Sequence, residues 1–140
     1  EPFEEEIHLS GLPTLHIDVT TQGCNGGQIF ATLWDETLGL RLGHAVMDIR
    51  YRDGGYDAKP VSPLFGSYTM LMEFNPLDVV LPAGHVLSIE LTDTGEDYLP
   101  STCAATGLSV DGGTFGMPLI ERPSNHDNWF EVAHYNASVV

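Results

Sequence analysis

Basic residues are scarce in this sequence: its 140 residues include only five Lys and Arg against twenty Asp and Glu, a formal net charge of −15 at pH 7. An acidic surface repels the phosphates of nucleic acids and of anionic lipids, so neither is expected as a partner. Two interpretations of the charge stay open, namely solubility in a saline, acidic or extracellular setting, and binding of cations. The charge excludes classes of partner without selecting one.

Long hydrophobic runs are also absent. The uninterrupted apolar runs span only a few residues, so no transmembrane helix is expected. The opening residues, Glu-Pro-Phe-Glu-Glu-Glu, have neither the basic nor the apolar part of a secretory leader, and they lack an initiator Met. A processed chain, an excised chain or a recombinant fragment would each explain this opening.

Cysteine is nearly absent, and both examples, Cys24 and Cys103, fall in predicted loops. A bridge between them would close a loop of roughly eighty residues, worth about 4 kcal/mol in the chain-entropy treatment. The sequence leaves open whether they form this disulfide or remain free thiols. A bridge would imply an oxidising compartment, in agreement with a predicted extracellular or cell-surface location.

Helical periodicity is missing, and the pattern that is present is typical of a β domain. Nine Pro and fifteen Gly interrupt the chain at about the spacing of a sandwich or barrel. Leu15, Ile17 and Val19 alternate with polar residues, as a half-buried strand requires. Residues 1–140 are therefore predicted to form a single all-β, antiparallel β-sandwich with eight or nine strands and no convincing helix.

The same alternation predicts where individual strands lie. A first strand over residues 3–9 is only weakly apolar and is expected at a sheet edge. The fourth strand, over 40–51, changes the phase of its apolar positions, which a β-bulge near Gly43-His44 would explain. Residues 99–113 are expected to be irregular, followed by a short strand at 114–121 and a last strand within 129–139.

Four segments carry a family resemblance. They are the segment Glu5–Leu15, with Ser10-Gly11-Leu12-Pro13 at its centre, the strand Gly27–Asp35, the strand Leu42–Tyr51, and the corner Pro82-Ala83-Gly84-His85 with the alternating strand after it. In this order they resemble segments of the non-catalytic C-terminal domain of X-prolyl dipeptidyl-peptidases and cocaine-esterase-type serine hydrolases. The resemblance covers roughly residues 5–122, and four segments in register are more specific than any one alone.

The resemblance implies a jelly-roll (galactose-binding-like) fold attached to an α/β-hydrolase catalytic domain. In that family the catalytic triad lies in the hydrolase domain, and the jelly roll packs on it and helps to shape the substrate cleft. The chain is therefore expected to be a non-catalytic accessory or binding domain with a hydrolase domain as partner. Its own nearest approach to a serine nucleophile motif, Gly107-Leu108-Ser109-Val110-Asp111, lacks the closing Gly.

Other strings of reactive residues favour structural interpretations. Gly23-Cys24-Asn25-Gly26-Gly27 is typical of a Gly-rich hairpin loop rather than of a cysteine protease. The six His residues lack zinc-site spacing, and His85, within the family corner, is expected to make a structural hydrogen bond. No cofactor is predicted, except that calcium could bind an acidic turn formed by Asp93, Glu96 and Asp97, or a second loop with Asp53 and Asp57.

Two further sites concern carbohydrate. The aromatic residues could form a sugar-binding platform, although aromatic residues at strand positions are more often core; the candidates are Trp34, Tyr51, Tyr56, Phe65 and Trp129. Asn136-Ala137-Ser138 fits a glycosylation sequon, which requires a secretory route for its use. A carbohydrate-binding module is thus one alternative function.

The terminal segments give the other alternative. Residues 1–10 and 129–140 are candidates for edge or protruding strands. An edge strand of one copy can complete the sheet of the next, so such strands would build an extracellular filament by donor-strand exchange. The opposing interpretation is that both strands close their own sandwich.

Overall fold

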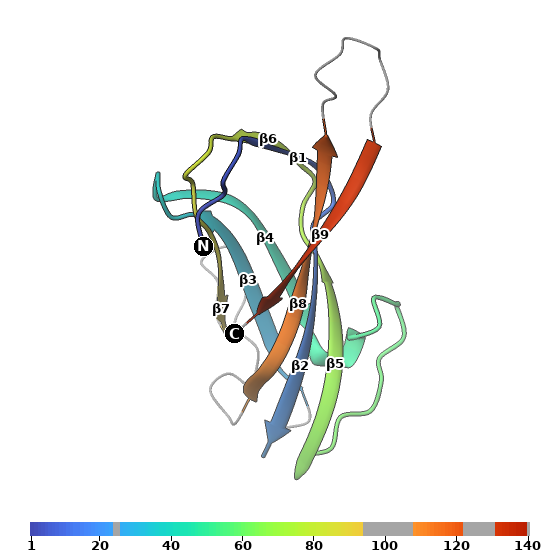
Figure 1. Cartoon of the computed structure of the whole chain (residues 1–140). Helices are drawn as coiled ribbons and strands as arrows, with labels where there is room; N and C mark the ends of the chain where they lie inside the picture. Colours follow the sequence, from blue (N-terminus) through green and yellow to red (C-terminus); the bar gives the residue numbers. More distant parts are fainter. Residues whose placement is uncertain (24–25, 94–107, 122–130, 140) are drawn as a thin grey trace.

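The computed structural model describes residues 1–23, 26–93, 108–121 and 131–139. In this part of the chain nine strands form two packed antiparallel sheets (Figure 1). The larger sheet has the order β5-β2-β8-β1-β6, with β9 pairing to β8, and the smaller sheet has the order β4-β3-β7. The predicted antiparallel β-sandwich is confirmed.

Strand lengths range from five residues in β1 and β6 to fourteen residues in β8. The elements are β1 (Ile7–Gly11), β2 (Thr14–Gln22), β3 (Gln28–Asp35), β4 (Leu40–Asp48), the short 3-10 helix η1 (Ile49–Tyr51), β5 (Phe65–Glu73), β6 (Leu77–Leu81), β7 (Leu87–Thr92), β8 (Leu108–Glu121) and β9 (Glu131–Val139). No helix among the described residues is both long and apolar enough to cross a membrane.

In the larger sheet, two pairs of strands lie end to end, with a kink between the two strands of each pair. β2 and β1 follow one another along β8, because Thr14 pairs with Gly116 and Leu9 with Leu119. β5 and β6 likewise follow one another along β2 and β1. The kink between β1 and β2 needs glycine: Gly11 has a φ of 135°, and a Cβ there would lie 3.0 Å from Cβ of Pro118.

The smaller sheet contains the predicted β-bulge. Leu33 pairs with Gly43, whereas Trp34 pairs with Arg41, so Leu42 is the extra residue on β4. The bulge lies beside the predicted Gly43-His44 position. Gly43 also allows Asn75 to approach, and the Asn75 side-chain oxygen accepts a hydrogen bond from the His44 amide at 2.8 Å, which joins β4 to the kink between β5 and β6.

The core lies between the sheets and follows the predicted alternation. On β2, Leu15, Ile17 and Val19 are fully buried, while His16 and Asp18 face solvent. Each such apolar side chain contributes about 1.5–3 kcal/mol when removed from water. The remaining core residues include Leu9, Ile29, Ala31, Leu33, Ala45, Ile49, Val61, Met70, Met72, Phe74, Leu81, Phe115 and Met117.

Three expectations about strands are wrong. β1 is not an edge strand, because it pairs with β6 on one side and with β8 on the other. The fourth strand ends at Asp48 rather than at residue 51, because the Asp48 carboxylate accepts from the Arg50 amide at 2.9 Å and caps η1.

The third error concerns β8, which begins at Leu108 instead of residue 114. Gly112 and Gly113 suggested irregular chain, but they lie within β8, paired with Asp18 and Ile17. A Cβ on Gly113 would lie 3.2 Å from the Ile17 Cα and even closer to the His16 carbonyl oxygen. Glycine is therefore required here by close packing of two strands, and it does not break the strand.

Candidate functional site

The structure tests the predicted metal sites only in part. Asp93 lies exposed just after β7, and its proposed partners Glu96 and Asp97 fall outside the described residues. In the other acidic loop the Asp53 carboxylate lies 3.5 Å from the Lys59 ammonium, so a basic side chain occupies one side of it. Among the residues that the structure describes, no group of three or more His, Cys, Asp or Glu side chains could hold a metal ion. Calcium binding stays a prediction.

The aromatic candidates are not brought together as one platform. Trp34 lies near the end of β3, and its indole nitrogen donates to the Glu90 carboxylate at 3.1 Å. Tyr56 and Phe65 belong to the segment that follows the opposite end of β4. Trp129 lies outside the described residues, as do Cys24 and Cys103, so the disulfide stays a prediction. Asn136 lies in β9, paired with Gly116, and its glycosylation is likewise still a prediction.

The corner that contains His85 is a structural site built on a buried carboxylate. The His85 ring nitrogen Nδ1 lies 2.7 Å from Oδ2 of Asp35, whose side chain is fully buried at the end of β3. The other Asp35 oxygen accepts from the backbone amides of Thr37 and Leu38 at 3.0 and 3.3 Å. Phe3 pairs with this corner through backbone hydrogen bonds to His85 and Gly84. The predicted structural hydrogen bond of His85 is confirmed.

The electrostatics of this corner agree with a structural role. Burial opposes ionisation of Asp35, but the hydrogen bonds from His85, Leu38 and Thr37 outweigh it and hold the pKa of the carboxyl below its usual 3.8. The ionised carboxylate thereby joins the β3–β4 turn to the start of β7. The described hydrogen-bond partners of Asp35 all belong to the same domain, so its pair with His85 stabilises the fold.

The connection between β4 and β5 is a second, outward-facing site. Its first half is anchored by Arg52, whose guanidinium lies 4.7 Å from the centre of the Tyr68 ring. The same guanidinium donates to the carbonyl oxygens of Ile49 and Pro60 at 3.1 and 3.3 Å. Arg52 therefore joins two points of the connection, Ile49 and Pro60, to β5 through one planar group.

Its second half is held by the core and by Tyr68. Val61 is buried among the core residues, and the neighbouring Ser62 amide donates to the Tyr68 hydroxyl at 2.7 Å. Across the connection, the Lys59 amide donates to the Arg50 carbonyl at 2.7 Å. These contacts fix a long connection that the sequence alone indicates only as a Pro- and Gly-rich loop.

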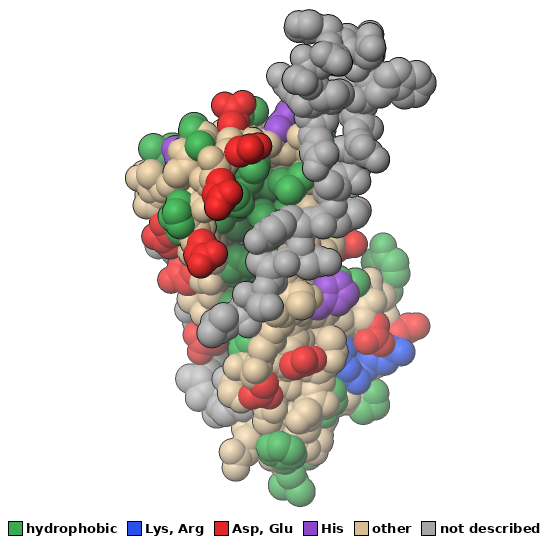
Figure 2. All heavy atoms as spheres, in the orientation of Figure 1, with side chains coloured by type: hydrophobic (Ala, Val, Ile, Leu, Met, Phe, Trp, Pro, Cys, Tyr) green, Lys and Arg blue, Asp and Glu red, His purple; other side chains and the backbone are tan. Residues whose placement is uncertain are grey.

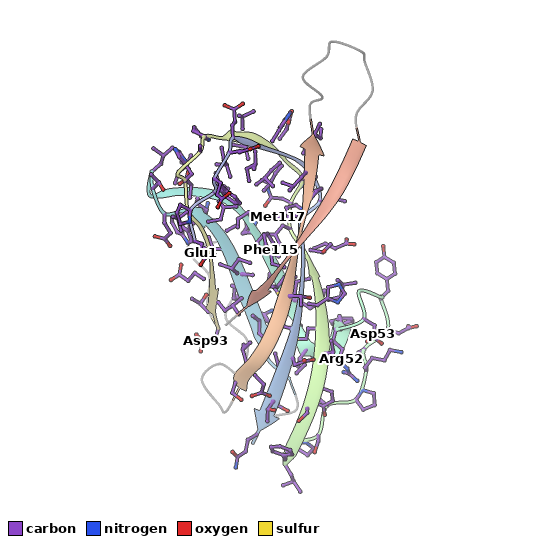
Figure 3. All side chains as sticks on the ribbon, viewed as in Figure 1. Glu1, Arg52, Asp53, Asp93, Phe115 and Met117 are labelled. Carbon is purple, nitrogen blue, oxygen red and sulfur yellow. The ribbon has the colours of Figure 1, made fainter. Side chains whose placement is uncertain are left out.

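Large apolar side chains project from this fixed connection. Tyr56 has a relative exposure of 103%, Leu64 of 80% and Phe65 of 63%, and Tyr51 is also exposed. We call residues 51–65, from the last residue of η1 to the first residue of β5, the anchored loop. Figure 3 shows Arg52 and Asp53 at its base, on the side of the sandwich away from Glu1.

Charge also sets the anchored loop apart. Three of the five basic residues of the chain, Arg50, Arg52 and Lys59, lie in or beside it. Figure 2 shows the Lys and Arg side chains of the visible face gathered in a single blue area. They offset Asp48, Asp53 and Asp57, so residues 48–72 carry no net charge and the rest of the chain carries the full −15. The sequence already contains this local neutrality. Considering Asp53 and Asp57 only as calcium ligands leaves out the basic residues beside them.

The comparison with protein families identifies the chain. Residues 1–130 match the family described as the X-Pro dipeptidyl-peptidase C-terminal non-catalytic domain. The chain belongs to this family. The match confirms the resemblance drawn from the four sequence segments. Because the family is described as non-catalytic, it also confirms that this chain is not the catalytic part of an enzyme and is an accessory domain.

Solved structures show the same fold. Two structures of a CocE/NonD family hydrolase from Staphylococcus aureus match 85% and 79% of this chain, with TM-scores of 0.60 and 0.52 and sequence identities of 12% and 14%. The match spans only 29% and 25% of those longer chains. Comparison with curated protein sequences gives no match. None of these findings supports the filament or the sugar-binding alternative.

Proposed function

We propose that this domain serves a serine hydrolase of the X-prolyl dipeptidyl-peptidase or CocE/NonD type, by packing against its catalytic α/β-hydrolase domain and completing the substrate cleft. The observation that carries the proposal is the family match over residues 1–130. The similar solved structures support it, since both are of a CocE/NonD family hydrolase in which the matched region is less than a third of the chain.

The geometry of the domain suits packing better than chemistry. Its best-organised polar pair joins the buried Asp35 carboxylate to the half-buried His85 ring, within the fold. Its exposed apolar side chains are held on an anchored loop, as a surface that contacts another protein requires. Both features support an accessory role in which this domain contributes shape and stability, and the partner contributes the reacting groups.

The test is hydrolysis with and without the domain. The probe is the CocE/NonD-type catalytic domain of the same source, assayed on X-Pro p-nitroanilides and on small p-nitrophenyl esters. We expect no turnover by the 140-residue chain alone, and a higher kcat/KM and Tm of the catalytic domain when the chain is present. Equal kcat/KM and equal Tm with and without the chain would contradict the proposal.

A further inference from the structure

We propose that the anchored loop, residues 51–65, is the surface through which this domain docks on its catalytic hydrolase domain, with Tyr56, Leu64 and Phe65 as the principal contacts. This inference rests on the proposed function and adds the location of the contact. It is carried by three properties of the loop: its charge, its exposed apolar groups and its fixed conformation.

Charge restricts where another protein can approach. The chain has a formal charge of −15, and an acidic surface repels an acidic partner and slows its association. Residues 48–72 carry no net charge, so an acidic partner meets the least repulsion there. Figure 2 shows basic side chains at only one place on the visible face, where acidic side chains adjoin them, and further acidic side chains spread over the rest of it.

Exposed apolar groups supply the attraction. Four of the nine large hydrophobic side chains that are exposed among the described residues lie between positions 51 and 65. Two are tyrosines and one is a phenylalanine, and aromatic residues together with Arg are enriched in the energetically important centres of protein interfaces. The loop thus combines the side chains that such a centre uses.

The fixed conformation lowers the cost of binding. A flexible loop would lose conformational entropy when it is ordered at an interface, which weakens association. Here Arg52 stacks on Tyr68 and donates to two carbonyl oxygens, and Val61 is buried in the core. The exposed side chains are therefore presented from a backbone that is already ordered.

The catalytic domain is the occupant that fits best. In the two structures of the similar hydrolase the matched region is 29% and 25% of the chain, so that hydrolase contains a much larger body to which such a domain belongs. A second copy of this chain fits less well, because two copies would bring together bodies of charge −15 each. Self-association through the loop is kept as an outcome of the test.

The experiment compares three variants. Tyr56→Ser and the double change Leu64→Ser with Phe65→Ser remove the proposed contacts, and Leu38→Ser is the control. Leu38 has a relative exposure of 65%, close to that of Phe65, but lies in the turn between β3 and β4 at the other end of β4. The probe is the catalytic domain named above, as a separate protein or, where both parts form one polypeptide, within the full-length hydrolase.

Two measurements are made on each variant. The first is the affinity for the catalytic domain by calorimetry or, where both parts form one polypeptide, the Tm of the catalytic part. The second is amide hydrogen exchange. We expect each loop variant to raise Kd by about tenfold or more, as for an interface hot spot, with Leu38→Ser unchanged. In the wild-type protein we expect slowed exchange at residues 51–65 when the catalytic domain is present.

The outcomes separate the inference from the proposed function. Full affinity in both loop variants, with slowed exchange at another surface, would overturn the docking site and leave the accessory role intact. An equal loss in Leu38→Ser, or self-association of the chain that the loop variants abolish, would also overturn it. No binding and no effect on hydrolysis by the wild-type chain would overturn the proposed function and the inference together.

Discussion

The two ends of β4 use polar contacts for different purposes. At the Leu40 end, the buried Asp35 carboxylate accepts its hydrogen bonds from His85 and from the turn that follows β3, within the same domain. At the Asp48 end, about 30 Å away for a nine-residue strand, Arg52 and Tyr68 hold a loop whose apolar side chains face outward. The difference teaches that stability and partner contact are placed apart in this domain, so mutations can separate them.

The largest expected effect is at the buried corner. His85→Leu removes the partner of a fully buried carboxylate, and an unsatisfied buried group is costly. We expect a fall in Tm of roughly 10 °C, measured by differential scanning calorimetry at pH 7. The matched control is His16→Leu, on the exposed face of β2, which should leave the Tm nearly unchanged. Equal Tm values for the two variants would show that the corner does not hold the fold.

A smaller loss is expected when the loop anchor is displaced by a methyl group. In Gly66→Ala the added Cβ would lie 2.6 Å from carbons of the Tyr68 ring, which must then move away from Ser62 and Arg52. We expect a loss of about 1–3 kcal/mol in the free energy of unfolding, measured with urea.

Gly55→Ala is the control for that change, since its Cβ meets nothing within 4 Å in the same loop. This variant should stay within about 0.5 kcal/mol of wild type. If the two alanine variants are equally stable, the Tyr68 anchor contributes nothing to the fold.

Loss of the guanidinium should have a milder effect. Arg52→Met keeps an apolar stem but removes the contact with Tyr68 and two hydrogen bonds to carbonyl oxygens. We expect a loss of about 1–2 kcal/mol, together with faster amide exchange in residues 51–65 and unchanged exchange around Asp35. Faster exchange at both ends of β4 would show that the two regions are not independent.

Acidic pH should weaken both ends, and this is the smallest effect near neutrality. Burial opposes ionisation of Asp48, but its hydrogen bonds and ion pair with Arg50 hold its pKa below 3.8, and the pKa of Asp35 is lowered as well. A carboxyl with a lowered pKa in the folded state stabilises the fold above its unfolded pKa, and loses that contribution as the pH falls through the folded value.

We therefore expect constant stability from these two groups between about pH 5 and 7 and a decline below about pH 4, measured by urea unfolding across pH. Asp48→Asn should reduce the steepness of the decline, because it removes one of the two groups. A slope that is the same in Asp48→Asn as in wild type would exclude a contribution from the Arg50 pair.

The sequence by itself determined features that depend on neighbours in the chain. The two-residue alternation of apolar and polar side chains indicated which face of β2 is buried, and a change in the phase of the apolar positions of β4 located the bulge beside Gly43. The Pro-Ala-Gly-His corner and three other segments were enough to indicate the family and the structural role of His85. Each of these patterns is local, so each can be recognised in the sequence without knowledge of the fold.

Only the tertiary structure decided the features that depend on distant pairing. β1 lies between β6 and β8 although its own sequence is weakly apolar, because strand pairing depends on the neighbours that cover both sides. Gly113 lies in a strand that packs closely against Ile17. The anchored loop is held because the Arg52 guanidinium packs on the Tyr68 ring. These contacts join residues from different elements, and no local pattern of residues encodes which elements will meet.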